Sequence, residues 1–377
     1  MDNILIAGDI FPSKDNQMLF ESFDARTLFG DYLFKLFSNA GFSIANFEGT
    51  ITDSSDYQHK VGPLLKTSPK SINALKALGL SAVALANNHI TDYLRKGVSD
   101  TIVSLENAGL QHIGAGVDVI GNSITVEING KRICIFNVSE TFFNIQFVNL
   151  YDDYEVCREL QRLKSMHDYL IVIYHGGTEN YPYPTPSVYK RFHRMADNGA
   201  DFITAQHTHC IGCEEWYNGS YLLYGQGNFL FSRMNGKYNR QGLVTEIDFS
   251  KNDIAIIQHQ VFVNNDGTLY CPENRNLDDF YERSHQITDN SFIKSNYLSY
   301  IANNTKLQTD YIQSYRGKSI TGTLLRKLFP NYYKKWICRQ YSEQHLLRIL
   351  LSLQSDRTGE NVLCVWEKIY RELNNKR

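Results

Sequence analysis

The chain has 377 residues, of which 42% are hydrophobic, and a formal net charge of −2. This length and apolar content suit a globular protein of two or three domains, and no repeat or low-complexity block interrupts it. The first apolar run covers only residues 4–7, no stretch of about 18 apolar residues follows, and the seven cysteines are scattered. These features exclude a signal peptide, a membrane span and a disulfide framework, and predict a reduced, cytoplasmic protein.

Strand and helix signals alternate through the first part of the chain. The strands are predicted over 3–9, 42–49, 80–88, 168–177, 200–209 and 221–231, with hairpins over 123–140 and 243–263. The helices are predicted over 27–39, 69–79, 93–108, 152–167 and 187–198. Strands that alternate with helices, mixed with some hairpins, are typical of an α/β sandwich whose sheets are covered by helices.

The character of the sequence changes near residue 265. Residues 1–265 carry 28 acidic and 21 basic side chains, whereas residues 266–377 carry 12 acidic and 17 basic ones. Strand signals fade after this point, and helices are predicted over 290–315, 320–352 and 358–374. The sequence therefore predicts a first domain over 1–265 and a helical C-terminal extension over 266–377.

The most basic part of this extension is the segment 324–341, LLRKLFPNYYKKWICRQY. Its mixture of apolar, aromatic and cationic residues is found in helices that lie at a membrane surface, here the inner face, and equally in packed helices with a solvated basic face. The second interpretation is favoured. Nucleic-acid binding is not expected, because no recognised module accompanies the charge.

Polar side chains follow five of the apolar runs, at the point where each predicted strand ends. In chain order they are Asp9, Glu48, Asn88 with His89, His175, and His207 with His209. Each alone is more often a turn, cap or structural residue than a ligand. Together they offer carboxylate, amide and imidazole groups, a mixture that suits Mn²⁺, Fe or Zn²⁺ better than Mg²⁺ or Ca²⁺. The sequence therefore predicts a divalent metal site at the strand ends.

His207 and His209 form a His-x-His pair. In an extended segment, side chains two residues apart point to the same side, so we expect both imidazoles to reach one cluster. That geometry is typical of two metals about 3.5–4 Å apart, each taking one imidazole, with Glu48 between them.

Seven short motifs resemble, in content and order, those of the CapA family of capsule or poly-gamma-glutamate synthesis proteins, which belongs to the calcineurin-like metallophosphoesterases. They are GDIFPSKD (8–15), NFEGTIT (46–52), ANNHITDY (86–93), GLQHIGAG (109–116), HGGTENY (175–181), AQHTHCIGCEEWYNGS (205–220) and YGQGNFLFS (224–232). The resemblance covers roughly residues 4–232. It implies a metallophosphatase-like β-sandwich flanked by helices, to which the C-terminal helices are an appendage.

The resemblance also implies roles for individual residues. It assigns ligands of a first metal to Asp9 and His209, a bridging carboxylate to Glu48, and ligands of a second metal to Asn88, His175 and His207. His89 matches a general acid that does not bind metal, and Asp92 would orient its imidazole through a hydrogen bond.

The chain departs from the metallophosphoesterase pattern at several positions. Phe11 stands where a histidine ligand is common, and Gly176 stands where the family usually has tryptophan. The residues before the His-x-His pair are Ala205 and Gln206 instead of Gly-His. Because Phe11 removes a ligand, the sequence leaves open whether the site holds one metal ion or two.

Three further features lie near the motifs. Lys60 belongs to the polar loop 50–69 and is interpreted as a contact for an anionic substrate, with a solvated loop as an equal alternative. Asn228 is expected to be a turn residue close to the site, with substrate contact as the second interpretation. Cys210 and Cys213 invite a redox or zinc interpretation, but buried small hydrophobes are the favoured one.

We therefore predict a metal-dependent, phosphoesterase-type hydrolase of capsule or poly-gamma-glutamate biosynthesis. It would act on an anionic polymer or a phosphoester, together with other capsule-synthesis proteins. Two alternatives stay open: a non-catalytic scaffold in a polymer-synthesis complex, motivated by Phe11 and the basic segment, and a nucleotide phosphodiesterase.

Overall fold

The structure, a computed structural model, describes residues 2–60, 62–118, 121–140, 147–231, 238, 240–251, 254–272 and 276–304, with short pieces between 324 and 336. The chain divides into two compact units, Met1–Lys294 and Ser295–Arg377. The helix predicted over 290–315 is present as α8 (Asn290–Asn303) in its described part. The helix predicted over 358–374 and most of the segment 324–341 lie outside the described residues.

The first unit continues past the boundary that the charge pattern predicts at residue 265. Helix α7 (Asp278–Gln286) buries Phe280 in the core between the two sheets. The hydroxyl of Ser284 on the same helix accepts a hydrogen bond from the backbone N–H of Glu214 at 2.9 Å. These contacts explain why the residues that follow 265 belong to the first unit.

The first sheet is mixed and has β1 at its centre. Its order is β16 (Leu269–Tyr270), β15 (Ala255–Val263), β14 (Gln241–Asp248), β1 (Asn3–Phe11), β2 (Phe42–Phe47), β5 (Ala82–Ala84) and β6 (Gln111–Ile113), and β13 (Asn228–Phe231) also pairs with β1. Strands β1, β2, β5 and β6 are parallel, whereas β14, β15 and β16 are antiparallel to their neighbours.

The second sheet is also mixed. Its order is β11 (Glu214–Tyr217), β12 (Ser220–Leu223), β10 (Phe202–Gln206), β9 (Tyr169–His175), β8 (Lys131–Ser139) and β7 (Ser123–Ile128). The hairpin predicted over 123–140 is confirmed, because β7 and β8 pair antiparallel around the Asn129–Gly130 turn. A short third sheet joins β3 (Thr50–Ile51) to β4 (Lys66–Thr67) within the loop predicted to be irregular.

Side chains alternate between the two faces of each sheet, as the period of two along a strand requires. On β1, Ile4 and Ile6 join the core between the sheets, while Leu5 and Ala7 face the helices of the first sheet. Strand β9 behaves in the same way, since Ile171 and Ile173 face the first sheet and the intervening residues face helices. The sandwich is therefore built around one inner core and two outer ones.

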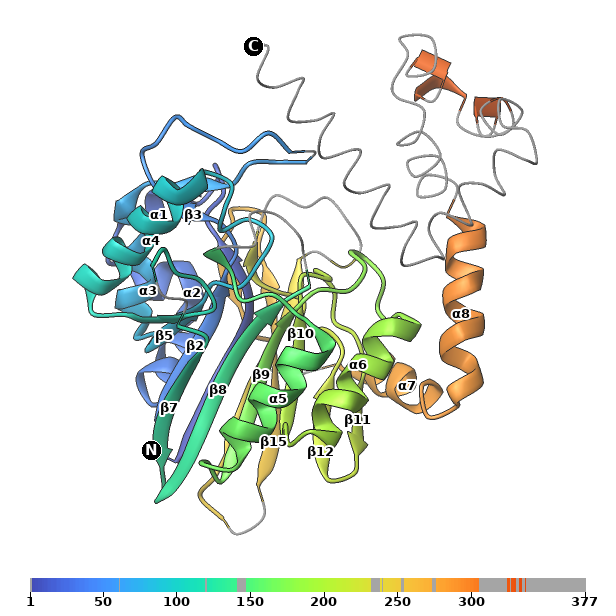
Figure 1. Ribbon diagram of the computed structural model, residues 1–377. Coiled ribbons are helices and arrows are strands. Elements are labelled where there is room, and N and C mark those ends of the chain that lie inside the picture. The colour runs from blue at the N-terminus through green and yellow to red at the C-terminus, as the bar shows by residue number, and fades with distance from the viewer. Residues whose placement is uncertain are drawn as a thin grey trace. The chain divides into compact units, whose positions relative to one another are not determined.

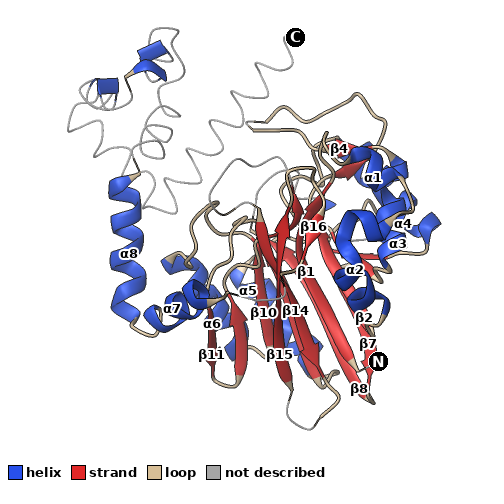
Figure 2. Cartoon of the chain, turned by 180° about the vertical axis from the view of Figure 1, so that it is seen from behind, coloured by secondary structure: helices blue, strands red, loops and turns tan. Residues whose placement is uncertain are grey.

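Helices cover both outer faces (Figures 1 and 2). On the first sheet they are α1 (Gln17–Glu21), α2 (Ala25–Ser38), the 3₁₀ turn η1 (Pro69–Ser71) with α3 (Ile72–Leu78), and α4 (Leu94–Ala108). On the second sheet they are α5 (Asp153–Lys164) and α6 (Pro186–Asp197). The predicted α/β sandwich of helix-covered sheets is confirmed.

One strand prediction is wrong. The segment 221–231 was expected to form a single strand, but it breaks at Gly225–Gly227 into β12 of the second sheet and β13 of the first. Gly227 has a φ of 69°, and a side chain there would collide with the backbone of Gln241. The two glycines therefore let the chain cross from one sheet to the other, which places Asn228 beside Asp9.

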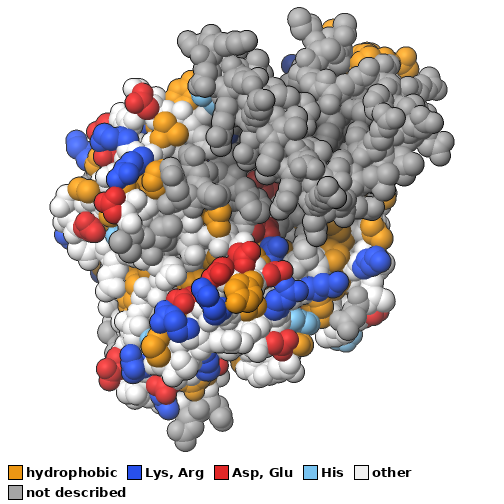
Figure 3. All heavy atoms as spheres, in the orientation of Figure 1, with side chains coloured by type: hydrophobic (Ala, Val, Ile, Leu, Met, Phe, Trp, Pro, Cys, Tyr) orange, Lys and Arg blue, Asp and Glu red, His pale blue; other side chains and the backbone are white. Residues whose placement is uncertain are grey.

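Charged side chains of both signs are interspersed over α5 and α6 on the outer face of the second sheet (Figure 3). They include ion pairs between Arg158 and Glu155 and between Arg162 and Glu159. Among the described residues, no helix combines the length and apolar character that crossing a membrane requires.

Candidate metal centre

The predicted ligands come from both sheets of the sandwich. Asp9 lies in β1, and Glu48 directly follows β2 of the first sheet. His175 ends β9, and His207 and His209 follow β10 of the second sheet. Because the parallel strands of both sheets end at the same edge, all five side chains are buried together at the carboxyl ends of these strands.

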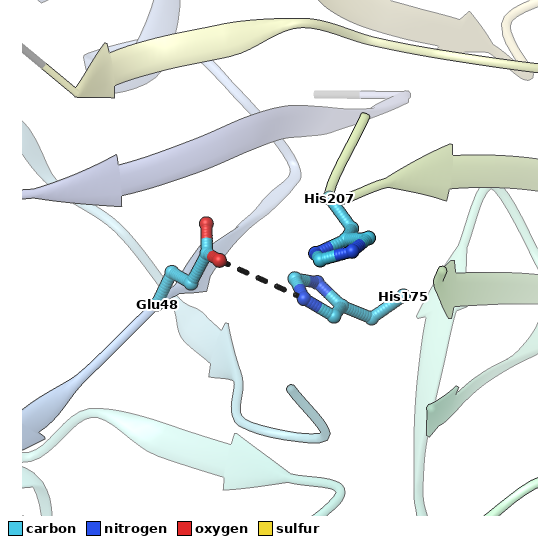
Figure 4. Close-up of side chains that lie close together, drawn as sticks. All are labelled: Glu48, His175 and His207. Carbon is cyan, nitrogen blue, oxygen red and sulfur yellow. Dashed lines mark ion pairs between the residues drawn. The ribbon is translucent and has the colours of Figure 1, made fainter. Parts of the chain in front are cut away.

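The described residues form two groups whose ligand atoms lie within 4.8 Å of one another. One group is Asp9, Glu48 and His209, and the other is Glu48, His175 and His207. Figure 4 shows the second group, with the two imidazoles side by side and directed toward the carboxylate. Glu48 belongs to both groups, with Oε1 on the side of His175 and Oε2 on the side of His209.

Glu48 provides the test of whether a metal fits. Its carboxylate is 1% exposed, and neither oxygen has a hydrogen-bond partner among the described residues. Two imidazole nitrogens lie near it: His175 Nε2 at 3.8 Å from Oε1, and His209 Nε2 at 4.0 Å from Oε2. A buried carboxylate without partners is costly, and a bound cation removes that cost. The residues therefore fit a divalent metal.

Electrostatic coupling within the first group is strong. His209 Nδ1 lies 3.4 Å from Asp9 Oδ2. Burial alone would raise the pKa of Asp9, but the hydrogen bond and charge of His209 outweigh it and lower that pKa. Burial opposes the charged form of His209, yet the carboxylates of Glu48 and Asp9 raise its pKa to about 10. These shifts favour the carboxylate form of Asp9 beside the imidazolium form of His209; a bound cation would require the neutral imidazole.

The second group favours uncharged imidazoles. Burial lowers the pKa of His175 well below its usual value, and the neighbouring His207 adds to this effect. Burial followed by the charge of His209 lowers the pKa of His207. Neutral imidazoles are the form that binds metal. Burial, and then the Asp9 carboxylate, raise the pKa of Glu48 well above its usual value.

The expectation that His207 and His209 extend a strand is wrong. Both have left-handed backbones, with φ values of 85° and 52°. Their ring centroids lie 6.1 Å apart, and each ring joins a different group. This conformation is uncommon for residues other than glycine and is often found at functional sites. The turn, rather than strand alternation, delivers one imidazole to each group.

Asn88 lies beside the second group, as the resemblance implies. Its Oδ1 is 2.9 Å from His175 Nε2. The preceding Asn87 has a structural role, since its Oδ1 accepts hydrogen bonds from the backbone N–H groups of His89 and Ile90. Of the two amides that follow β5, Asn87 therefore stabilises the turn and Asn88 contacts the site.

Asn46 has a part in the site that the sequence interpretation did not assign. It is fully buried on β2, and its Nδ2 donates to Asp9 Oδ1 at 2.7 Å and lies 3.3 Å from His175 Nδ1. Its own Oδ1 accepts from Asn87 Nδ2 at 3.1 Å. Asn46 thus orients one candidate ligand from each sheet. Its place two residues before Glu48, at the end of an apolar strand, was the available sequence signal.

Phe11 lies in the hydrophobic core. Its ring packs against Phe47 and Phe231, with centroids 5.5 and 6.2 Å away. A side chain on Gly49 would overlap this ring, so the glycine is required here. Phe11 thus adds no ligand to the first group, whose His, Asp and Glu members among the described residues are Asp9, Glu48 and His209.

Glu140 occupies the space beside Gly176, the second departure from the family pattern. Its carboxylate accepts hydrogen bonds from the Tyr174 hydroxyl, the Gly177 backbone N–H and the Arg191 guanidinium. A Cβ on Gly176 would overlap the Glu140 side chain. Glycine therefore makes room for a charged network that fastens the turn directly after His175.

The His89–Asp92 pair predicted from the resemblance is present. His89 Nδ1 lies 2.7 Å from Asp92 Oδ2, and the two side chains are 8% and 0% exposed. Burial lowers the pKa of His89, although its hydrogen bond with Asp92 acts in the opposite direction. Through this contact Asp92 Oδ2 can accept a hydrogen bond from Nδ1–H, which directs Nε2 away from Asp92.

The two proposed substrate contacts are both engaged with protein groups. The Lys60 ammonium is buried in an ion pair with Asp92. Asn228 is fully buried, and its Oδ1 lies 2.8 Å from His209 Nδ1. This contact orients the His209 ring, so that Nε2 faces Glu48. The structure thus gives both residues contacts to the site rather than to solvent.

Cys210 and Cys213 are buried free thiols next to the site. Burial raises the pKa of Cys210 to about 12 and that of Cys213 well above its usual value. Neither thiol therefore has the thiolate character that redox or metal chemistry requires.

The fold and the site together define a class of protein: an α/β sandwich with a candidate divalent-metal centre at its strand ends and a histidine–aspartate pair beside it. A family model described as "Bacterial capsule synthesis protein PGA_cap" matches residues 3–233. The chain belongs to this family.

Several known proteins are similar to the chain. Capsule biosynthesis protein CapA of Bacillus anthracis is 27% identical over 223 residues, covering 54% of each chain. PGA biosynthesis protein CapA of Bacillus subtilis (strain 168) is 27% identical over 246 residues, covering 62% of this chain and 64% of that one. The chain thus spans between about half and two thirds of the length of these curated relatives. A solved structure of a novel phosphatase from Mycoplasma pneumoniae is 17% identical, with a TM-score of 0.45, over 69% of this chain and 93% of that chain.

Proposed function

We propose that the protein is a metal-dependent, hydrolase-type enzyme of capsule or poly-gamma-glutamate biosynthesis, which acts on an anionic polymer or a phosphoester. One observation carries the proposal. Neither oxygen of the buried Glu48 carboxylate has a hydrogen-bond partner among the residues that the structure describes, and Glu48 belongs to two sets of candidate ligands. A carboxylate shared in this way is typical of two-metal hydrolytic centres.

Each residue has a separate part in this proposal. Asp9, Glu48 and His209 would hold one ion, and Glu48, Asn88, His175 and His207 would hold a second, with Mn, Fe or Zn as candidates. A divalent metal supplies Lewis acidity and an activated water at neutral pH. Asn46 contacts Asp9 and Asn228 contacts His209, and these contacts hold the two candidate ligands in a fixed orientation.

His89 would exchange a proton with the leaving group. Asp92 would accept a hydrogen bond from the Nδ1–H group of His89, and this bond selects the tautomer and the orientation of the ring. The Nε2 atom then faces the substrate, and in the imidazolium form it would donate its proton to the leaving group as the bond breaks, which leaves a neutral ring with its proton on Nδ1. Neither residue needs to contact the metal for this role.

The cellular setting belongs to the same proposal. Membership of this family supports the proposal that the protein acts together with other capsule-synthesis proteins. The described cysteines, five of the seven, are all free, as is usual in a reducing compartment, which supports the cytoplasm.

Metal content of single variants tests the proposal. We expect two equivalents in protein purified without chelators, and about one in His207→Ala and in His209→Ala, because each removes a ligand from a different group. His167→Ala is the matched control, since that ring bonds to Thr125 and Leu163 away from the site. Turnover of phosphoesters and gamma-glutamyl amides is then measured with each preparation.

A single equivalent in the wild type, lost in only one of the two variants, would replace the two-metal arrangement with one ion. Equally little metal in the wild type and both variants would refute the proposed function and favour a non-catalytic scaffold. Turnover restricted to nucleotides would favour a phosphodiesterase instead.

A further inference from the structure

Lys60 is a buried lysine with an unusual set of neighbours. Its side chain is 3% exposed, and its ammonium forms an ion pair with Asp92, which is 0% exposed. The Nζ atom also donates to the backbone carbonyl of Asn88 at 3.2 Å and lies 3.1 Å from His89 Nδ1. Burying an ammonium is costly unless it is paired and hydrogen-bonded. One cation thus contacts the acid pair and the backbone of a candidate ligand.

Asp92 fastens the loop that carries Lys60. Its Oδ2 accepts a hydrogen bond from the backbone N–H of Leu65 at 2.7 Å, and its backbone carbonyl accepts one from Gln58 at 2.8 Å. The carboxylate therefore binds the loop with one oxygen through Lys60 and with the other through Leu65. His89 shares this second oxygen. The position of the loop and the orientation of His89 depend on the same side chain.

We propose that Lys60 is a positioning residue, whose ammonium locks the loop of residues 52–60 and 62–65 onto Asp92 and thereby fixes the orientation of His89. Without the ammonium, Asp92 Oδ1 would be a buried charged atom that has lost its partner. The carboxylate would then turn toward water or toward another donor. Because Oδ2 moves with Oδ1, His89 and the Leu65 N–H would lose their common acceptor.

A second lysine, Lys66, directly follows this loop at the start of β4 and is exposed. Its Nζ contacts the Ser54 carbonyl at 2.7 Å and lies 4.9 Å from the centroid of the Tyr93 ring. Neither contact is with His89 or Asp92, although Lys66 directly follows the loop and carries the same charge as Lys60. Lys66 is therefore a matched control for the charge and the length of the Lys60 side chain.

The test compares Lys60→Met with Lys66→Met in the full-length protein. Amide hydrogen exchange is followed at Gln58 and Leu65, and ¹⁵N NMR reports which ring nitrogen of His89 carries the proton. For Lys60→Met we expect about tenfold faster exchange at both amides and loss of the Nδ1–H signature. Exchange within β9 serves as the internal measure that the fold is intact. Lys60→Arg, which keeps a charged donor, should retain most of the protection.

Kinetics supply the second readout, and this part rests on the proposed function. If Lys60 positions the acid, Lys60→Met should lower kcat by about 10- to 100-fold at nearly unchanged KM and metal content. Lys66→Met should leave all of these values unchanged. A raised KM with unchanged kcat and unchanged amide exchange would overturn the proposal and make Lys60 a substrate contact.

Unchanged amide exchange in Lys60→Met, together with an unchanged ¹⁵N NMR signature of His89, would also overturn the proposal that Lys60 is a positioning residue. Absence of metal and turnover from the wild type would refute the proposed function alone. The exchange and NMR measurements would still decide the role of Lys60 in that case. The two failures are therefore distinguishable.

Discussion

Replacing Glu48 by glutamine tests whether its unpaired oxygens are there to bind a cation. The folded state raises the pKa of this carboxyl through burial and through Asp9, so the charged form is disfavoured in the metal-free protein. A raised folded-state pKa means that stability is lost as the pH rises from the unfolded value, about 4.3, through the folded one. Wild type and Glu48→Gln should therefore be equally stable in acid and diverge toward neutral pH.

The burial of Glu48 sets the size of the stability difference between the wild type and Glu48→Gln. A buried polar group left unsatisfied costs about 1–3 kcal/mol, and more when it is charged. Metal-free Glu48→Gln should consequently be about 1–3 kcal/mol more stable than the wild type at pH 7, or about 2–6 °C in Tm at ~2 °C per kcal/mol. A metal at 100 times its Kd adds about 2.7 kcal/mol per site to the wild type, and this gain should largely vanish in the variant.

The assay is thermal unfolding with a chelator and with added Mn²⁺ or Zn²⁺, repeated from pH 4 to pH 8. Glu127→Gln is the matched control: Glu127 is exposed on β7, so this variant should have the stability of the wild type and should gain the same stability from added metal. The reasoning is refuted if metal-free Glu48→Gln is no more stable than the wild type and metal raises the Tm of both equally.

Three further outcomes are expected. Asn228→Ala should weaken metal binding by about 10- to 100-fold, measured by competition with a chelating dye, because the imidazole that it orients becomes free to rotate. Cys210 and Cys213 should resist alkylation at pH 8 until the protein is denatured, as peptide mass spectrometry would show; labelling of the native protein would contradict their burial. Gly176→Ala should destabilise the fold by about 1–3 kcal/mol, and by less in a Glu140→Ala background, when denaturant midpoints are compared.

Much of the fold could be predicted from local patterns. The apolar runs of β1, β2, β9 and β10 are short, continuous and followed by polar residues, which is how buried parallel strands look in a sequence. The helices were predictable because glycine closes α3 and α4 in left-handed conformations.

The break between β12 and β13 could not be predicted, since it depends on which sheet each half joins. The segment 221–231 is apolar on both sides of its two glycines, and only pairing with β1 shows that Asn228 belongs to the first sheet. The His-x-His turn was missed for a similar reason. Its left-handed conformation is imposed by contacts such as that between the His207 backbone N–H and Asp9, which is distant in sequence.

The role of Lys60 was also beyond local inference. A lysine in a polar loop is normally solvated, and no neighbouring residue in the sequence predicts that Lys60 is buried. The contact with Asp92 crosses more than thirty residues, and it becomes visible only when the loop folds over the end of β5. Residue type and strand-end position identified the candidate ligands, but the residues that orient them emerge from tertiary contacts.

The central place of β1 has a consequence for how the chain folds during synthesis. Residues 3–11 are made well before two of their partners, because one edge of this strand pairs with β13 and β14, which end at Asp248. At about 5–20 residues per second, those partners leave the ribosome roughly 10–50 s later. Throughout that interval an apolar strand bearing Asp9 has an unpaired edge, which can template aggregation. A nascent chain of this protein should therefore depend on a chaperone until residue 248 has emerged, and a truncation before β13 should aggregate rather than form a smaller domain.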